Sequence, residues 1–117
     1  QHRPEVEWLG GVEIAESAAA EAKAVCDEVW CGNIETLDLP VPSGSVDALL
    51  CLDVLEHLVD PWEAVKKLQG FLRPGGVLIA SLPNIRYYKV TIPLVVLGRF
   101  EYRKAGILDR THLRFFV

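Results

Sequence analysis

Methionine is absent from this sequence, and cysteine is scarce. The three cysteines (Cys26, Cys31 and Cys51) are odd in number and form no CxxC pair. This arrangement excludes a disulfide framework and favours a reducing, cytoplasmic setting. Because no methionine marks a start codon, we expect the sequence to be a piece of a longer protein.

Long hydrophobic runs and basic surfaces are also missing. The longest apolar stretch, near Ile92 to Leu97, is far too short to cross a bilayer, so we expect no membrane partner. The formal net charge is −4, and no basic stripe is visible. We therefore expect no nucleic-acid partner, and we interpret the basic residues of the C-terminal third as solvated surface.

The sequence does contain a regular alternation of strand and helix patterns, and half of its residues are hydrophobic. Apolar runs predict strands at Val6–Ile14, Glu28–Cys31, Val46–Leu52 and Val77–Leu82. Helical spacing predicts helices at Glu16–Cys26, from Asp60 to Leu72, and at Ile85–Leu97 with a break near Pro93. Apolar strands that alternate with helices indicate an α/β fold, a mostly parallel sheet with helices on both faces.

The second predicted helix has clear start and stop signals. Asp60 can accept hydrogen bonds from free backbone N–H groups, and Pro61 suits the first helical position. Glu63 completes a pattern that resembles a capping box. Arg73–Gly76 (RPGG) is expected to stop the helix and turn the chain.

Polar residues follow the predicted strands where each strand ends. They are Glu13 after the first strand, Asn33 with Ile34 after the second, Asp53 after the third and Asn84 after the fourth. Ligands bind beyond the carboxyl ends of parallel strands, so we expect these side chains to line one crevice. A carboxylate can accept hydrogen bonds from both hydroxyls of a ribose, an amide can accept from an adenine amino group, and a second carboxylate can hold a charged amine. Ribose, adenine and an amine together describe S-adenosylmethionine. The alternative is that Glu13 caps the next helix and that Asn33 closes a tight turn.

Five motifs carry a family resemblance across residues 11–117. They are GVEI, GNIE, SVDALLCLDVLEHLVDP, LRPGGVLIASLPN and DRTHLRFF. With these motifs the sequence resembles the class I S-adenosylmethionine-dependent methyltransferases, above all the branch that includes ubiquinone-biosynthesis-type O-methyltransferases. The resemblance implies a Rossmann-like fold, S-adenosylmethionine as cofactor, and a single partial methyltransferase domain over residues 1–117.

The resemblance also assigns roles to individual residues. Glu13 would bind the ribose of the cofactor, Asn33 and Ile34 would meet the adenine, and Leu52 with Asp53 would border the methionine end. Asn33 departs from the family, which usually has Asp at that position, but an amide oxygen can still accept a hydrogen bond. The resemblance also makes His112 the catalytic residue, near the mouth of the pocket; the alternative is that His112 only packs within a loop.

The family's Gly-rich loop, a GxGxG pattern after its first strand, has no counterpart in this sequence. The strand and helix around that loop are also missing, as are the family's last helix and closing antiparallel strands, so we expect a domain truncated at both ends. The isolated fragment is expected to be inactive and to bind S-adenosylmethionine weakly. Its exposed sheet edges predict a homo-oligomer such as a dimer.

Two other functions remain open from the sequence. Asp53, Glu56 and His57 are spaced i, i+3, i+4, and with His112 they resemble the divalent-metal site of small-RNA 2′-O-methyltransferases. Carboxylates and imidazoles suit Mg²⁺ or Mn²⁺, which would make the protein a metal-assisted O-methyltransferase. Otherwise Glu56 and His57 only fix the loop before Asp60.

A degenerate, non-catalytic interaction domain is the second alternative function. A nicotinamide-dependent oxidoreductase is disfavoured by the DVLEHL and LRPGG motifs.

The methyl acceptor is expected to be a small molecule. The segment after the fourth strand carries the aromatic residues Tyr87, Tyr88, Phe100 and Tyr102, which could line a pocket for a hydroxylated molecule or simply pack. The stretch GILDRTHLRFF is similar to methyltransferases found beside sugar-modifying enzymes, so we expect an acceptor related to sugars.

Overall fold

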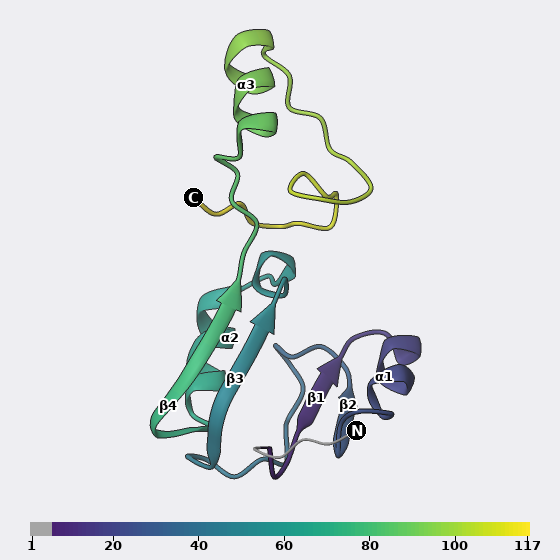
Figure 1. Ribbon diagram of the computed structural model, residues 1–117, viewed down its shortest axis with the longest axis vertical. Coiled ribbons are helices and arrows are strands. Elements are labelled where there is room, and N and C mark those ends of the chain that lie inside the picture. Colours follow the sequence, from purple (N-terminus) through teal and green to yellow (C-terminus); the bar gives the residue numbers. More distant parts are fainter. Residues whose placement is uncertain (1–5) are drawn as a thin grey trace. The chain divides into compact units, whose positions relative to one another are not determined.

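The computed structural model describes residues 6–117, and the strand predicted from Val6 lies within this range. The chain divides into two compact units, the first ending at Val41 and the second spanning Pro42–Val117. Figure 1 labels the helices and strands of each unit and colours them along the sequence. A single partial domain over residues 1–117 stays a prediction, and five of its residues lie outside the described range.

The first unit is a small strand–helix–strand motif. Strand β1 (Gly10–Glu13) pairs in parallel with β2 (Glu28–Cys31), and helix α1 (Glu16–Ala22) contacts both strands. The prediction for β2 is confirmed. Strand β1 is shorter than the predicted Val6–Ile14 because its ladder runs only along the four residues of β2.

Helix α1 is also shorter than predicted. Beyond Ala22 the backbone makes tighter bonds, from the N–H of Ala24 to the carbonyl of Glu21 and from that of Val25 to Ala22. These are i to i−3 bonds of the kind that close the last turn of a helix. The alanine-rich pattern therefore identifies the helix correctly but places its end too late.

The second unit begins with a longer strand–helix–strand motif. Strand β3 (Val46–Leu52) has the predicted bounds and pairs in parallel with β4 (Leu72–Ser81). Between them lie a short 3₁₀-helix, η1 (Leu55–His57), and helix α2 (Pro61–Gln69). Figure 1 shows α2 along one face of the two strands, and its Ala64 and Leu68 are buried. On β3, Cys51 is buried whereas Leu50 and Leu52 are exposed, so the described residues of the second unit leave one face of this sheet uncovered.

The start of α2 is confirmed in detail. The carboxylate of Asp60 accepts a hydrogen bond from the backbone N–H of Glu63 at 3.1 Å, and Pro61 occupies the first helical position. We expect Asp60→Ala to lower the free energy of unfolding by about 1 kcal/mol, because the N–H then loses its partner. Chemical denaturation measures this change. Asp60→Asn keeps a capping oxygen and should cost much less; equal losses in the two variants would contradict the capping role.

Strand β4 differs from the prediction because Arg73–Gly76 lies inside the strand. While β3 advances from Val46 to Ala48, its partner advances from Leu72 to Val77, so the RPGG residues bulge out of the ladder. A Cβ on Gly76 would lie 3.0 Å from the carbonyl oxygen of Val46. The predicted turn is therefore a bulge, and glycine at position 76 lets the two backbones approach.

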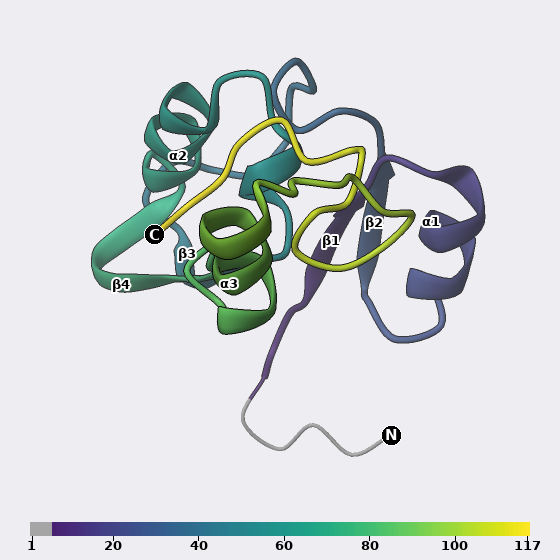
Figure 2. The ribbon, with the colours of Figure 1, turned by 90° about the horizontal axis from the view of Figure 1, so that it is seen from above.

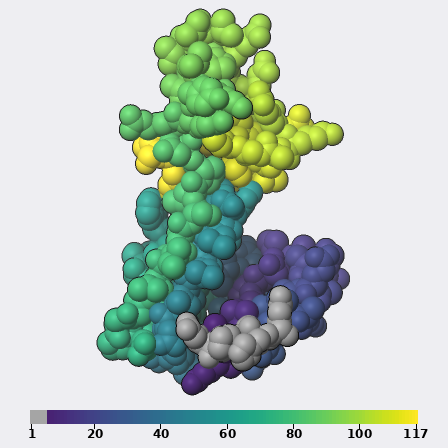
Figure 3. All heavy atoms as spheres, in the orientation of Figure 1, coloured from purple at the N-terminus to yellow at the C-terminus, as the bar shows by residue number. Residues whose placement is uncertain are grey.

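After β4 the chain forms helix α3 (Tyr88–Leu97), which continues through Pro93 and ends at Gly98 in the left-handed conformation. The predicted break at Pro93 is wrong: proline removes one backbone donor, but the N–H of Gly98 still reaches the carbonyl of Leu94. The C-terminal segment returns to the residues that directly follow β4, where Phe116 forms an isolated parallel β-bridge with Asn84. Figures 2 and 3 show this segment in yellow beside the green residues that follow β4.

The strands within each unit pair in parallel, as predicted. The described strands form two parallel pairs, β1–β2 in the first unit and β3–β4 in the second. That all four strands share one sheet therefore stays a prediction. None of the described helices has the length and apolar composition required to cross a membrane.

Candidate functional site

Glu13 lies at the carboxyl end of β1, as predicted. The backbone N–H of Gly32 donates to the carbonyl oxygen of Glu13 at 2.9 Å, so the chain leaving β2 passes beside it. The Glu13 side chain is half-buried, and among the described residues no donor contacts its carboxylate. The carboxylate is thus available to accept hydrogen bonds from the hydroxyl groups of a ligand.

Asn33 and Ile34 lie at the same edge of this small sheet, directly after β2. The side-chain oxygen of Asn33 accepts from the backbone N–H of Glu35 at 2.9 Å, and its carbonyl accepts from Leu37 at 2.8 Å. Asn33 therefore closes a turn, which is the alternative that the sequence left open. A second lone pair on its side-chain oxygen can still accept from a ligand, so contact with adenine stays a prediction.

Asp53 follows β3 in an unusual backbone conformation. Its φ is +53°, and it is the only non-glycine residue with positive φ in the described part of the chain. This left-handed conformation costs about 1–2 kcal/mol, and such strain is concentrated at functional sites. The hydroxyl of Ser81 donates to the Asp53 carboxylate at 3.0 Å and accepts from the Asp53 N–H at 3.0 Å. Ser81, which sequence reasoning missed, therefore holds Asp53 in place, beside the exposed side chain of Leu52.

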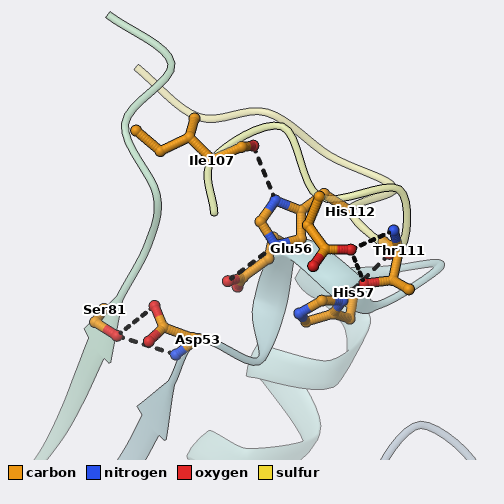
Figure 4. A network of polar contacts seen from close by, with 8 residues as sticks. Asp53, Glu56, His57, Ser81, Ile107, Thr111 and His112 are labelled. Atoms are coloured by element: carbon orange, nitrogen blue, oxygen red, sulfur yellow. Dashed lines mark hydrogen bonds and ion pairs between the residues drawn. The ribbon is translucent and has the colours of Figure 1, made fainter. Parts of the chain in front are cut away.

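A second group of polar residues lies where η1 meets the C-terminal segment. The backbone N–H groups of Leu113 and Arg114 both donate to the carbonyl of Glu56, at 2.8 and 3.2 Å. Figure 4 shows Glu56 and His57 facing His112 across this junction. The Glu56 side chain is 1% exposed and that of His112 is 8% exposed. His112 is thus brought to Glu56 from a distant part of the sequence.

Backbone carbonyls orient both imidazoles of this group. Nδ1 of His112 lies 3.1 Å from the carbonyl oxygen of Ile107, and Nδ1 of His57 lies 3.2 Å from that of Thr111. The two rings meet edge to face, with centroids 4.7 Å apart. Nε2 of His112 lies 4.0 Å from a carboxylate oxygen of Glu56.

The loop before His112 is fixed by its own hydrogen bonds. The carboxylate of Asp109 accepts from both the N–H and the hydroxyl of Thr111, each at 2.8 Å. These two bonds lower the pKa of Asp109. Because the carboxylate form makes the bonds, the loop is held most firmly at pH values above the ordinary range of an aspartate.

An open hollow of about 480 Å³ lies beside His112. Its lining residues are Tyr102, Arg110, His112 and Leu113. Of the four aromatics predicted for an acceptor pocket, only Tyr102 contributes to it, whereas Tyr87 and Tyr88 contact each other. Arg110 was missed as a pocket residue, because nothing in the sequence distinguishes it from the other basic residues of this segment.

The structure corrects the predicted four-residue group of Asp53, Glu56, His57 and His112. Donor atoms of Glu56, His57 and His112 gather within 4.8 Å of one another, but Asp53 is not among them. Asp53 precedes η1 and turns toward Ser81, so it does not share one helical turn with Glu56 and His57.

Comparison with known proteins identifies a family for most of the chain. The family described as methyltransferase domain matches residues 7–80. A "Probable S-adenosylmethionine-dependent methyltransferase" of Mycolicibacterium smegmatis is 35% identical over 63% of the chain and 29% of that protein. The ubiquinone biosynthesis O-methyltransferase of Acinetobacter baylyi is 28% identical over 63% of the chain and 34% of its own length. The matched part thus spans about a third of the length of these relatives.

Solved structures agree on the fold. The YcgJ protein of Bacillus subtilis aligns with a TM-score of 0.61 and 22% identity, over 96% of this chain and 47% of that one. A SAM-dependent methyltransferase from Thermotoga maritima aligns with a TM-score of 0.60 and 22% identity, over 77% of this chain and 51% of that one. The Rossmann-like α/β prediction is confirmed. Because the family match covers more than half of the residues, the chain belongs to the methyltransferase-domain family.

Proposed function

We propose that the protein containing this chain transfers a methyl group from S-adenosylmethionine to a small-molecule acceptor. The family match over residues 7–80 carries the proposal, and relatives described as S-adenosylmethionine-dependent methyltransferases support it. Residues 1–117 would form part of the catalytic domain. Without a GxGxG loop in this sequence, we propose that these residues alone are inactive.

The residues at the strand ends fit this cofactor. The uncontacted, half-buried carboxylate of Glu13 suits the two ribose hydroxyls, and Asn33 with Ile34 suits the adenine. Asp53, held by Ser81 in a strained conformation, suits the charged amine of the methionine end, with Leu52 beside it. When bound, the cofactor supplies the reactive methyl group; the task of these residues is to bind and orient it.

We assign the acceptor side to the hollow beside His112. A histidine can accept the proton of an acceptor hydroxyl near neutral pH, and Nδ1 of His112 is already held by the carbonyl of Ile107. Tyr102 and Arg110 would contact the remainder of the acceptor. The resemblance of the C-terminal motif favours an acceptor related to sugars.

The test is a methyl-transfer assay on the full-length protein with radiolabelled S-adenosylmethionine and a panel of hydroxylated small molecules that includes sugars. Transfer to at least one acceptor supports the proposal. Tight cofactor binding without transfer to any member would contradict the sugar-related acceptor. No cofactor binding would favour the non-catalytic interaction domain.

Metal-assisted methyl transfer is a second candidate function, favoured by one observation. Glu56 is almost fully buried beside two imidazoles, and its Oε2 atom has no hydrogen-bond partner among the described residues. A divalent ion would satisfy this carboxylate, and it would take the place of His112 as the group that activates the acceptor.

We also propose that residues 1–117 self-associate in a cytoplasmic setting, where their three free thiols stay reduced. Each described strand has a single partner, so β1 and β3 each leave one edge for pairing with another strand. We expect sedimentation velocity at high protein concentration to detect a dimer or larger species. A clean monomer under those conditions would contradict strand pairing between copies.

A further inference from the structure

The hollow that we assign to the acceptor is lined by a segment that its own contacts hold in place. The backbone N–H of Arg103 donates to the carbonyl of Leu108 at 2.7 Å, and that of Arg110 donates to the carbonyl of Arg103 at 3.1 Å. The ring of Tyr102 contacts that of Phe115, with centroids 6.2 Å apart. Two of the lining residues, Tyr102 and Arg110, are thus positioned by the fold itself.

The guanidinium of Arg110 has no anionic partner among the described residues. The adjacent carboxylate, that of Asp109, instead accepts from the N–H and the hydroxyl of Thr111. Another arginine of this segment, Arg114, donates from its guanidinium to the carbonyl of Val59 and so joins two parts of the chain. Arg110 has no such structural contact through its side chain, and its charge faces the hollow without a counterpart from the described residues.

The segment around the hollow has a charge opposite in sign to that of the whole chain. Residues 86–117 carry seven basic and two acidic side chains, whereas the formal net charge of the chain is −4. Of the two acidic side chains, that of Asp109 is already bonded to Thr111. Charges of one sign around a hollow raise the local concentration of ligands of the opposite sign. An anion is therefore the kind of ligand that this segment attracts.

We propose that the methyl acceptor is an anionic sugar or a similar small hydroxyl compound, whose phosphate or carboxylate group binds Arg110. The inference rests on the proposed methyl transfer and names the class of its acceptor. A planar guanidinium can donate two parallel N–H bonds to either oxyanion, and the hydroxyl of Tyr102 can donate a third. A neutral sugar would leave the charge of Arg110 without a counterpart.

The spacing of Arg110 and His112 fits a single small molecule. Both side chains line the hollow, and because the residues are two positions apart, their α-carbons are at most about 7 Å from each other. With its oxyanion at Arg110, a sugar-sized acceptor can place one of its hydroxyl groups at the imidazole. The oxyanion only positions the acceptor: the hydroxyl loses its proton to His112, and its oxygen gains the methyl carbon from the sulfonium sulfur of the cofactor.

The test uses the full-length protein and four probes: glucose, glucose 1-phosphate, glucose 6-phosphate and glucuronate. Titration calorimetry in the presence of S-adenosylhomocysteine measures the binding of each probe, and transfer from radiolabelled S-adenosylmethionine measures turnover. We expect at least one anionic probe to bind roughly 10-fold or more tightly than glucose, because hydrogen bonds to charged groups are the stronger ones. This advantage should shrink as salt is added. Whether a glucose phosphate or glucuronate binds more tightly identifies the oxyanion.

Two variants make the test specific. Arg110→Gln should reduce the affinity for the anionic probe to about that for glucose, because it removes the charge and the paired N–H donors. Binding of S-adenosylmethionine should stay unchanged in this variant, which also shows that it is folded. Arg99→Gln is the matched control: Arg99 is an exposed arginine of the same segment, directly after α3, and it does not line the hollow. This control should keep the preference for the anionic probe.

The inference is overturned if no anionic probe binds more tightly than glucose, if Arg110→Gln keeps the preference, or if Arg99→Gln loses it to the same extent. Turnover separates this inference from the proposed methyl transfer. Methylation of glucose without any preference for anions would support methyl transfer and overturn the anionic acceptor. An anionic probe that binds through Arg110 but is not methylated would support the anion site and count against transfer at this hollow.

Discussion

His112→Ala in the full-length protein is expected to lower kcat for methyl transfer by roughly 10²- to 10⁴-fold, the usual contribution of a positioned acid–base group. The KM for S-adenosylmethionine should change little, because no cofactor role is assigned to this side chain. The physical reason is the position of the imidazole, which lines the hollow and is held at Nδ1 by the Ile107 carbonyl. Steady-state kinetics with each substrate varied in turn measures the two effects separately.

His112→Asn is the matched control for this experiment. Its side-chain N–H₂ can still donate to the carbonyl of Ile107, as Nδ1 does, but an amide cannot accept the proton of a hydroxyl. We expect it to keep the melting temperature close to that of the unsubstituted protein and to lose kcat as fully as the alanine variant. Near-normal kcat in His112→Asn would show that His112 is only a structural residue of its loop.

The same assay separates the two candidate roles of His112. If the imidazole itself accepts the proton, removal of metal ions with EDTA leaves kcat of the unsubstituted protein unchanged. If His112 is a metal ligand that acts through the ion, EDTA lowers kcat to about the level of the alanine variant, and Mn²⁺ restores it. A protein that is fully active without metal would thus dismiss metal-assisted transfer, whether or not the ion site exists.

Glu13→Ala is expected to weaken S-adenosylmethionine binding by the full-length protein roughly 10- to 100-fold. The estimate follows from hydrogen bonds to a charged group, which contribute about 1.5–3 kcal/mol. The half-buried carboxylate of Glu13 has no donor among the described residues, so its removal should not disturb another contact. Titration calorimetry measures the dissociation constant directly.

Glu28→Ala serves as the matched control for Glu13→Ala. Glu28 is exposed at the first position of β2, opposite Gly10, and therefore lies at the other end of the same small sheet. It should leave cofactor affinity unchanged, because ligands of parallel sheets bind beyond the carboxyl ends of the strands. Equal weakening by both substitutions would indicate a general charge effect, and no weakening by Glu13→Ala would remove Glu13 from the proposed ribose site.

Several elements could be predicted from local sequence because local forces determine them. The bounds of β2 and β3 follow from short apolar runs between polar or turn residues, and the start of α2 follows from Asp60 and Pro61. Glu13 and Asp53 could be placed at strand ends for the same reason. The family motifs, which combine these local patterns, were sufficient to indicate a methyltransferase domain, and the match to residues 7–80 confirms it.

Tertiary contacts decided what local patterns could not. The length of β1 depends on its short partner β2, and the RPGG residues bulge because β3 runs beside them. The left-handed φ of Asp53, stabilised by Ser81, turns its carboxylate away from Glu56 and His57, although sequence spacing suggested one cluster. His112 reaches Glu56 only because the C-terminal segment bonds to the η1 backbone. The sequence by itself thus determined the family, whereas contacts between distant segments decided which side chains meet, because periodicity describes a single element and not its neighbours.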